Sequence, residues 1–511
     1  MSFNNFNTKH NMIISVIVAF TNNGKGIGKN GVLPWKLKKD MSYFKAMTIP
    51  HNKLFQNAVI MGRKTWDSIP EQFRPLKDRV NIVITRNKNL LGIKETDCEE
   101  DIVNNVIYEK DGVYFTNSLF RAYEFSKEKN IHECFVIGGE QIYKQAFEMK
   151  SNLFSVNKIY TTTIYKKIEC DTFFPLTDFE TDYKLCHVYP IEEENDIYFR
   201  FLTYYSKKYM KKHDVSCIFE NTEENEALKS MEQIMRFGQE RIERTGVGTR
   251  SLFGLSWKYD ISSNFPLMTT KRMFFRGIFE ELALYISGKT DNKILQEKNI
   301  HIWDGNTSRE FLDKRGLTNY PEGDMGETYG FNMRHYGANY IDCHHDYSGQ
   351  GFDQLQYVID SIKNDPSSRR MLINLWNPAT CHKAALPSCM MQYQFYVRTE
   401  LKKLDLQVYL RSSDYFLANN WNVCTAALLV YMICNLEDID LTPGEITVVT
   451  GDTHIYKSHL DAVKENLKRT PRPFPQLFIK EKKKSLEDFT YEDIKLVGYT
   501  PYPSIKAEMA V

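Results

Sequence analysis

The sequence predicts two domains, of which the first has an α/β fold with a mainly parallel sheet flanked by helices. The chain has 511 residues, more than one hydrophobic core normally serves. Short apolar runs alternate with turn signals and helix-like stretches in its first part, as is typical of such a sheet. A charged, apolar-poor stretch follows at 207–226. We therefore predict domains at 12–207 and 225–511, joined by a linker at 208–224.

The strands of the first domain are predicted from continuous apolar runs. The run at 12–20 is apolar almost throughout, as expected of a strand that is buried on both faces. Shorter runs at 58–61, 80–85 and 134–137 predict further strands, and 197–205 predicts the strand that closes the sheet.

Two helices are predicted in the second domain from their apolar pattern. Four apolar residues fall on one face at helical spacing: Leu228, Met231, Met235 and Ile242. They predict an opening amphipathic helix that ends at 244–246, with Gly246 as its terminator. The stretch 423–436 is apolar around most of its circumference, which predicts a buried helix.

Composition argues against several classes of function. The formal net charge is +1, so no general basic field exists and nucleic acid is an unlikely partner. The ten cysteines show no CxxC pair or regular spacing, which indicates reduced thiols, a cytoplasmic location and no metal site. The residues before 12 lack an apolar signal region, and the apolar runs at 12–20 and 426–434 are too short to span a membrane.

The segment 26–31 matches GxGxxG but does not predict a dinucleotide-binding helix. Leu33-Pro34-Trp35 follows it, and proline disfavours helix in the residue before it. The glycines indicate either a loop over a site or a plain surface loop. Asp40 also has two interpretations. It is either an acid at a helix start, favoured by the helix dipole, or a buried carboxylate that accepts two hydrogen bonds from a heterocycle.

Three further segments suit anion binding. Met61 to Trp66 places two cations and a hydroxyl behind a strand. Ile137-Gly138-Gly139 lies where a strand should pass into a helix, so a ligand can approach the backbone and the helix N–H groups. Arg79, after Arg74-Pro75-Leu76, offers a guanidinium to a carboxylate.

Together and in this order, the segments closely resemble dihydrofolate reductase over about residues 12–207. The matching text is Ile27-Gly28, Leu33-Pro34-Trp35, Asp40, Phe44, Gly62 to Trp66, Arg74-Pro75-Leu76, Arg79, Ile137-Gly138-Gly139, Tyr143, Thr162 and Asp171 to Pro175. The resemblance implies that Asp40 and Thr162 anchor the pterin, that Phe44 packs against the folate, and that Arg79 binds the α-carboxylate of its glutamate tail. The implied NADPH site is lined by Val18, Ile27, Gly28, Arg63, Lys64, Thr65, Thr85, Arg86, Gly138, Gly139 and Tyr143.

The resemblance also implies a mechanism. Hydride from NADPH would reach C6 of dihydrofolate while N5 gains a proton. An ionised Asp40 would favour the protonated pterin electrostatically. No proton donor at N5 is evident in the sequence, so water is the expected route.

Cys389 is the candidate nucleophile of the second domain. A lone cysteine is usually a small core residue. Arginines beside turn signals or strand ends supply cations that could bind a phosphate and favour a thiolate: Arg244, Arg369, Arg370 and Arg411. Adjacent arginines are also common on solvated faces, and a pair on one strand points in opposite directions unless one reaches across a dimer interface.

Residues 225–511 resemble thymidylate synthase, which implies an α+β domain that forms homodimers. The matching text is Arg244-Thr245-Gly246, Phe265-Pro266-Leu267, Thr269 to Arg272, Glu280-Glu281-Leu282, Ile302-Trp303-Asp304, Tyr329-Gly330, Asp346-Tyr347, Asp353-Gln354-Leu355, Arg369-Arg370, Trp376-Asn377-Pro378, Cys389, Gln394-Phe395-Tyr396, Arg411-Ser412, Asp414, Asn422 and Gly451 to Tyr456. The order of the two domains resembles the fused enzyme of protists and plants.

The second resemblance implies a role for each matched residue. Cys389 would add to C6 of dUMP, so that C5 attacks 5,10-methylenetetrahydrofolate. Glu281 would organise proton transfer, and Asp414 would meet the folate ring. The dUMP site would consist of Arg244, Arg369, Arg370, Arg411 and Ser412 on the phosphate, Asn422 on the uracil, and His454 and Tyr456 on the ribose. Without this context, His454 would be interpreted as a structural histidine.

The second domain departs from its family at several positions. Met390 stands for histidine, Leu410 for glutamine, Leu284 for a tryptophan on the folate side, Asp291 for asparagine, Glu327 for proline, and Ala418 to Trp421 for a stretch with glycine, proline and phenylalanine. These changes would chiefly weaken folate placement. Two hypotheses therefore stand beside each other: two active enzymes in one chain, or an active reductase with a synthase-like scaffold for dimerisation or ligand binding. An RNA-binding role is disfavoured by the lack of a basic stretch interleaved with aromatics.

Overall fold

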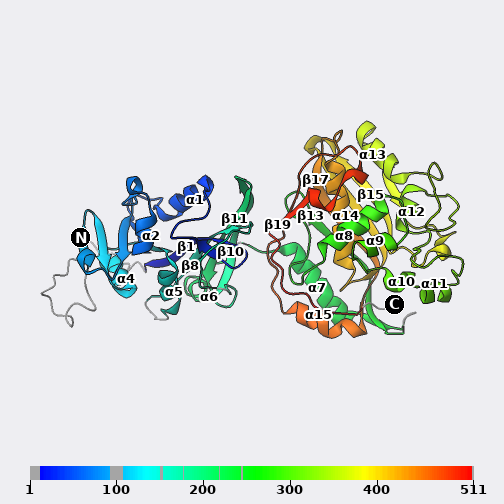
Figure 1. The fold of residues 1–511 in the computed structure, drawn as a ribbon. Coiled ribbons are helices and arrows are strands. Elements are labelled where there is room, and N and C mark those ends of the chain that lie inside the picture. Colours follow the sequence, from blue (N-terminus) through cyan, green and yellow to red (C-terminus); the bar gives the residue numbers. More distant parts are fainter. Residues whose placement is uncertain are drawn as a thin grey trace, which may run out of the picture. The chain divides into compact units, whose positions relative to one another are not determined.

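The structure is a computed structural model that describes residues 12–91, 107–149, 154–176, 178–217, 219–242 and 246–508. The chain divides into two compact units, Met1–Glu220 and Asn221–Val511, which can be followed by colour in Figure 1. The division lies within the predicted linker. Part of that stretch is nevertheless regular, since helix α6 (Lys207–His213) is capped by the Ser206 side chain and helix α7 begins at Thr222.

The first unit is built on a nine-stranded sheet in the order β10-β11-β8-β1-β7-β3-β4-β6-β5. Its strands are β1 (Ile13–Thr21), β3 (Asn57–Gly62), β4 (Val80–Ile84), β5 (Tyr108–Lys110), β6 (Val113–Thr116), β7 (Glu133–Gly138), β8 (Lys158–Ile164), β10 (Tyr183–Glu194) and β11 (Ile197–Ser206). All pairings from β8 to β6 are parallel, and those at the two edges are antiparallel. The predicted mainly parallel sheet is confirmed.

Helices cover both faces of this sheet. They are α1 (Lys38–Thr48), α2 (Arg63–Ser68), α4 (Leu119–Glu128) and α5 (Glu140–Glu148). In β1, Val16 packs in a cluster with side chains of α4 and α5, whereas the next residue, Ile17, packs with side chains of α1 and α2. This alternation explains why the strand is apolar at successive positions.

The GxGxxG segment forms no helix, as expected from the proline that follows. Gly26–Gly28 is a short strand, β2, that pairs with β9 (Thr172–Phe173) in a separate ribbon. Asp40 lies in the first turn of α1, and β7 passes through the glycine pair into α5, both at the predicted places.

The second unit contains a six-stranded sheet in the order β12-β13-β17-β16-β15-β14, with a small ribbon of β18 and β19. Its strands are β12 (Gln239–Arg241), β13 (Thr249–Asp260), β14 (Leu372–Asn374), β15 (Met390–Arg398), β16 (Lys403–Asp414), β17 (Thr442–Tyr456), β18 (Gln476–Ile479) and β19 (Ile494–Val497). Only β16 and β17 run parallel among its neighbouring strands. An α+β domain is therefore present.

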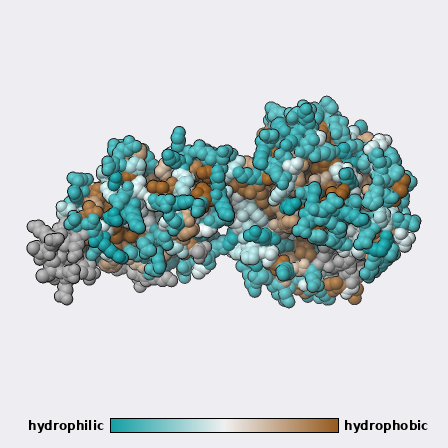
Figure 2. Space-filling model, in the orientation of Figure 1, coloured by the Kyte–Doolittle hydropathy of each residue, from teal (hydrophilic) through white to brown (hydrophobic). Residues whose placement is uncertain are grey.

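The second unit has a buried helix, α14 (Asn419–Cys434), which packs against α8 (Phe275–Ile286) and against strands β16 and β17. The other helices are α7 (Thr222–Phe237), α9 (Lys293–Glu297), α10 (Asp304–Thr307), α11 (Arg309–Lys314), α12 (Tyr329–Arg334), α13 (Gln354–Asn364) and α15 (Leu460–Leu467). Every residue of α14 except Trp421 is buried, which confirms the predicted buried helix. None of the described helices is long and apolar enough to cross a membrane. Figure 2 shows mainly hydrophilic residues on the visible face of both units, with apolar residues in small separate groups.

The opening helix of the second unit is shorter than predicted. Helix α7 ends at Phe237, and Gly238 leaves it with extended backbone. A side chain at 238 would lie 2.4 Å from a carbonyl oxygen of the preceding turn, so only glycine fits there. The chain then forms β12, and Ile242 is 90% exposed. The prediction that the helix continues to 244–246 was wrong, because the earlier apolar positions already complete its buried face.

Candidate functional site

One face of α1 forms the floor of the first candidate site. Asp40, Phe44 and Thr48 follow one another at four-residue spacing, so their side chains lie along the same face. Asp40 is 5% exposed, and the Thr162 hydroxyl from β8 donates a hydrogen bond to its Oδ1 at 2.6 Å. Burial raises the pKa of Asp40 to about 6, and the bond from Thr162 opposes that rise.

A guanidinium lies at the other end of this face. Arg79 Nη1 donates to Thr48 Oγ1 at 2.8 Å, and the Arg79 Cζ lies 5.8 Å from the centre of the Phe44 ring. Burial lowers the pKa of Arg79. The face therefore offers a carboxylate, an aromatic ring and a cation in a row. That order suits a ligand with a hydrogen-bond-donating heterocycle at one end and a carboxylate at the other.

A glycine pair connects β7 to α5. Gly138 has φ +129°, and the Gly138–Gly139 peptide is cis. A Cβ on either glycine would lie 3.3 Å from Thr65 Oγ1, so this hydroxyl lies directly against the pair. Tyr143, one turn into α5, donates its hydroxyl to the Ile17 carbonyl at 2.8 Å and so ties the helix to β1.

The remaining residues of the predicted NADPH site gather at one edge of the sheet. β3, β4 and β7 are parallel neighbours, so their carboxyl ends open on the same edge. The residues that follow these ends are Arg63, Lys64 and Thr65 after β3, Thr85 and Arg86 after β4, and Gly139 after β7. Val18 is buried in β1, while Ile27 and Gly28 belong to β2. Arg63 is paired with Asp67 at 2.7 Å on the same helix. A glycine pair at a helix start and cations at the same edge of the sheet fit a cofactor that carries phosphate groups.

Cys389 lies directly before β15, at the centre of the second candidate site. Its N–H donates to the Tyr329 hydroxyl at 2.7 Å, and its carbonyl accepts the N–H of Arg411 at 3.0 Å. The Arg411 side chain turns back toward the same segment, where Nε donates to the Ser388 carbonyl at 2.9 Å and Nη2 to the Pro387 carbonyl at 2.8 Å. The structure thus brings one predicted arginine to the backbone segment that precedes the cysteine.

The other predicted arginines are Arg369, Arg370 and Arg244. Arg369 and Arg370 lie between α13 and β14, both exposed, and neither forms an ion pair with another described residue. Arg244 lies outside the described residues. The phosphate cluster implied by the resemblance is therefore incomplete in the described part of one chain.

The predicted nucleotide residues lie where β16, β17 and α14 meet. Ser412 and Asp414 pair with Asp452 and His454 across the parallel strands. His454 Nδ1 lies 3.0 Å from Asp452 Oδ1, a contact that orients the ring. Asn422 lies in the first turn of α14, and Tyr456 ends β17.

Asp414 has neighbours that the sequence did not single out. Its Oδ1 accepts the N–H groups of Phe416 and Leu417, each at 3.1 Å, and the His459 ring nitrogen lies 3.8 Å away. The Lys271 ammonium is buried and donates to the Phe416 carbonyl. Burial lowers the pKa of Lys271 to about 8, and the charge of Asp414 opposes this. The sequence signal for Lys271 was its place in the matched segment 269–272.

Glu281 is a buried carboxylate held by two indoles. Trp303 Nε1 donates to Oε1 at 2.8 Å, and Trp421 Nε1 donates to Oε2 at 2.7 Å. Burial raises the pKa of Glu281, and the hydrogen bond from Trp421 is the largest of the effects that oppose it. Neither indole was predicted as a partner, because the residues are far apart in sequence.

Two of the departures from the family, Met390 and Leu410, lie next to each other in the structure. Met390 and Leu410 are direct cross-strand partners in β15 and β16, and both are buried. The Tyr393 hydroxyl lies 3.0 Å from the Met390 sulfur. An apolar pair therefore replaces the polar pair expected from the resemblance, so neither member leaves a buried polar group without a partner.

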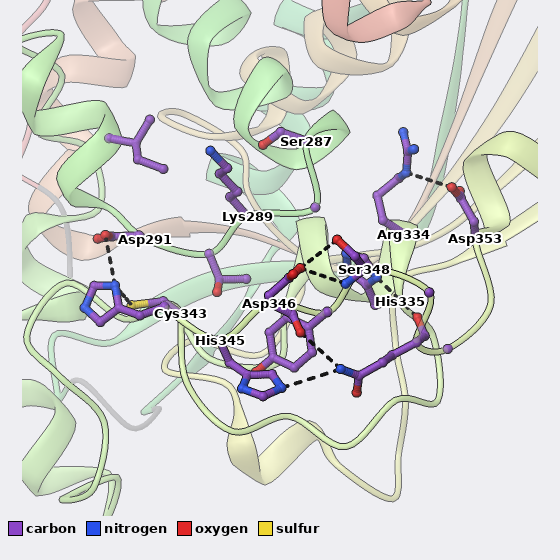
Figure 3. A pocket seen from close by; sticks show the side chains of 18 residues that line it. Ser287, Lys289, Asp291, Arg334, His335, Cys343, His345, Asp346, Ser348 and Asp353 are labelled. Carbon is purple, nitrogen blue, oxygen red and sulfur yellow. Dashed lines mark hydrogen bonds and ion pairs between the residues drawn. The ribbon is translucent and has the colours of Figure 1, made fainter.

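A polar pocket of about 800 Å³ lies in another part of the second unit (Figure 3). It is lined by residues 287–291, Ile294, 334–335, 343–351 and Asp353, and by none of the predicted catalytic residues. On its wall, Asp291, Cys343 and His344 offer metal-ligand atoms within 4.8 Å of one another. His344 lies 3.7 Å from Asp291, which also accepts the N–H of Lys293. These contacts account for the group without an ion, and we assign no metal to it.

Comparisons with known proteins identify a family for each part of the chain. A family model described as dihydrofolate reductase matches residues 13–206, and one described as thymidylate synthase matches residues 226–511. A bifunctional dihydrofolate reductase-thymidylate synthase of Zea mays is 40% identical over 527 residues, which cover 97% of this chain and 96% of the relative. The proteins of the same description from Glycine max and Leishmania major are 41% and 37% identical, over 97% and 95% of this chain and 95% and 93% of the relatives.

Proposed function

The chain belongs to the bifunctional dihydrofolate reductase–thymidylate synthase family, and from this premise we propose which of its residues carry the two reactions. It is an enzyme that reduces dihydrofolate with NADPH and converts dUMP to dTMP with 5,10-methylenetetrahydrofolate. The alternative of an inactive synthase scaffold is not favoured, because the relatives are bifunctional over nearly the whole chain.

For the reductase, we assign the pterin to the Asp40 end of α1. The observation that carries this assignment is the buried Asp40 carboxylate, which accepts a hydrogen bond from Thr162 and keeps its second oxygen for the heterocycle. NADPH supplies the hydride when bound, and we assign its pyrophosphate to the glycine pair at the start of α5. The negative charge of Asp40 favours the protonated pterin, and Phe44 packs against the folate.

For the synthase, we assign Cys389 as the nucleophile toward C6 of dUMP. Arg411 holds the phosphate close to the thiolate, with Ser412 beside it. Asn422 can both donate to and accept from the uracil edge. Glu281 organises proton transfer at the pyrimidine from a buried position, and Asp414 meets the folate ring. His454 and Tyr456 bond the ribose.

Both activities can be tested in one cuvette with the full chain. NADPH oxidation started with dihydrofolate reports the reductase alone. Oxidation started with dUMP and 5,10-methylenetetrahydrofolate requires both sites, since the synthase must first make dihydrofolate. Release of tritium from C5-labelled dUMP reports the synthase directly. A chain that oxidises NADPH only with dihydrofolate, and releases no tritium, would restore the scaffold hypothesis.

Replacing Arg79 by glutamine should raise the KM for dihydrofolate by about 10- to 100-fold and leave kcat nearly unchanged. The guanidinium would bind the glutamate tail, far from the reacting C6, so its loss weakens substrate and transition state alike. Lys77→Gln removes an exposed charge two residues away and serves as the matched control. A fall in kcat with an unchanged KM would contradict the assignment.

We also propose that the chain forms a homodimer through the synthase domain, in which Arg369 and Arg370 bind the phosphate in the partner's site. Their exposed positions, without ion-pair partners among the described residues, support this. Isologous dimers place the same residues of both subunits at the shared interface.

Co-expression of two inactive variants tests the dimer. One carries Cys389→Ser, and the other carries Arg369→Ala with Arg370→Ala. If the arginines act across the interface, a mixed dimer has one intact site, and random pairing should restore about a quarter of the wild-type activity. Each variant expressed alone is the control. Failure to restore activity in purified mixed dimers would show that the arginines act within their own chain.

A cytoplasmic location stays a prediction from the irregular cysteine spacing, and cell fractionation would test it. A role in nucleic-acid binding remains disfavoured by the balanced charge of the chain.

A further inference from the structure

Trp421 is placed where its indole reaches the buried carboxylate of the synthase site. It lies in the first turn of α14, and its Nε1 donates to Glu281 Oε2 at 2.7 Å. Trp303 donates to the other oxygen at 2.8 Å, so each carboxylate oxygen receives one indole N–H. Within the described residues, no lysine, arginine or histidine forms an ion pair with Glu281. Neutral hydrogen-bond donors therefore compensate for its burial.

The indole of Trp421 also fits a gap in helix α8. Gly277 lies one turn before Glu281, on the same face of the helix. A Cβ at 277 would lie 2.7 Å from Trp421 Cη2 and 2.7 Å from a ring carbon of Phe274. Glycine destabilises a helix interior, so its presence here needs a packing reason. The indole supplies that reason, because it lies across Gly277 and continues to the carboxylate.

The hydrogen bond from Trp421 to Glu281 depends on a residue in which this chain departs from the family pattern. Asn420-Trp421 stands where the family resemblance expects proline and phenylalanine, and a phenylalanine ring has no N–H to donate. The change accompanies the loss of a family tryptophan at Leu284, which is buried in α8. The sequence therefore has an aromatic donor on α14 and lacks a family tryptophan on α8.

We propose that Trp421 is a positioning residue of the synthase reaction, whose indole N–H fixes the orientation of the Glu281 carboxyl group for proton transfer at dUMP. The inference rests on the proposed role of Glu281 and adds the group that controls it. Gly277 contributes to this arrangement, because a Cβ at this position would meet the Trp421 indole.

The proposal predicts a change in pH dependence as well as in rate. Burial raises the pKa of Glu281, and the bond from Trp421 is the strongest effect that lowers it, ahead of those from Trp303 and Tyr285. Removing the bond raises the pKa further, so the carboxylate becomes protonated at a higher pH. The acid limb of the synthase pH profile should therefore move toward higher pH.

The test is Trp421→Phe in the full chain, with Trp257→Phe as the matched control. Trp257 lies in the same unit, is buried, and donates its indole N–H at 2.8 Å to Ser230 instead of to a carboxylate. Tritium release from C5-labelled dUMP gives kcat and kcat/KM across the pH range. We expect Trp421→Phe to be about tenfold slower than wild type on the acid side and to approach it at high pH. Trp257→Phe should keep the wild-type profile.

A second variant, Gly277→Ala, keeps the indole but removes the space it needs, and should show the same displaced acid limb. Superposition of the Trp421→Phe and wild-type profiles, or an equal rate loss at every pH, would overturn the inference. Failure of the underlying assignment is distinguishable, because Glu281→Gln would then retain full tritium release. Thermal unfolding checks that each variant folds, and reductase activity in the same sample gives the active enzyme concentration.

Discussion

Asp40→Asn is expected to lower reductase turnover by about 10²- to 10³-fold while it stabilises the reductase unit at neutral pH. The turnover falls because the amide carries no negative charge to favour the protonated pterin. NADPH binding should remain nearly intact, because the proposed cofactor site lies at the ends of β3, β4 and β7. Stopped-flow measurement of NADPH oxidation, together with NADPH titration by fluorescence, separates the two effects.

The gain in stability follows from the pKa of the buried carboxyl group. The pKa in the folded state is about 6, above the usual 3.8, so the folded state binds more protons between these values. The contribution of Asp40 to the free energy of unfolding therefore falls as pH rises from about 4 to about 6, and is constant above that range. Relative to wild type, Asp40→Asn should gain up to about 3 kcal/mol at pH 7.5 and little at pH 4.

Thr162→Val is the matched control for this prediction. It keeps the carboxylate but removes the hydrogen bond that lowers its pKa, so the rate should fall less than in Asp40→Asn. Denaturant unfolding of the full chain, followed by a probe in the first unit, gives the free energy at each pH. The role given to Asp40 would be contradicted if Asp40→Asn left turnover at neutral pH unchanged. It would also be contradicted if Asp40→Asn were less stable than wild type by an amount that increases with pH.

Cys389→Ser should lower dTMP formation by about 10³-fold or more and leave the reductase rate unchanged. A serine hydroxyl is not ionised at neutral pH, so the adduct at C6 of dUMP does not form and C5 is not activated. Tritium release from C5-labelled dUMP should disappear together with dTMP formation. Loss of dTMP with continued tritium release would instead assign another nucleophile.

Cys381→Ser is the control for the cysteine change. Cys381 lies in the same unit, is also partly exposed, and precedes the site segment by only a few residues. It should retain full synthase activity. Because the reductase lies in the other unit, its rate in the same sample measures the concentration of folded chain independently.

The local sequence predicted the elements well where burial is uniform. The strand at 12–20 and the helix at 423–436 are apolar on all sides, and both are found close to their predicted bounds. It failed at the end of α7, where Ile242 continued the helical spacing by coincidence. Periodicity records which residues suit a buried face, but only packing decides where that face ends.

The amino-acid sequence by itself determined the family, the two reactions and the chemical type of each site residue. It could do so because motifs such as those around Asp40 and Cys389 are present in the sequence in the order that the family has. The tertiary structure alone decided how those groups are controlled. It brought Arg411 into contact with the Cys389 segment, and it joined Met390 to Leu410 as one apolar pair. It also placed two indoles from distant parts of the sequence where each donates a hydrogen bond to Glu281. Hydrogen bonding and desolvation depend on distances of a few ångströms between residues far apart in the chain, and those distances exist only after folding.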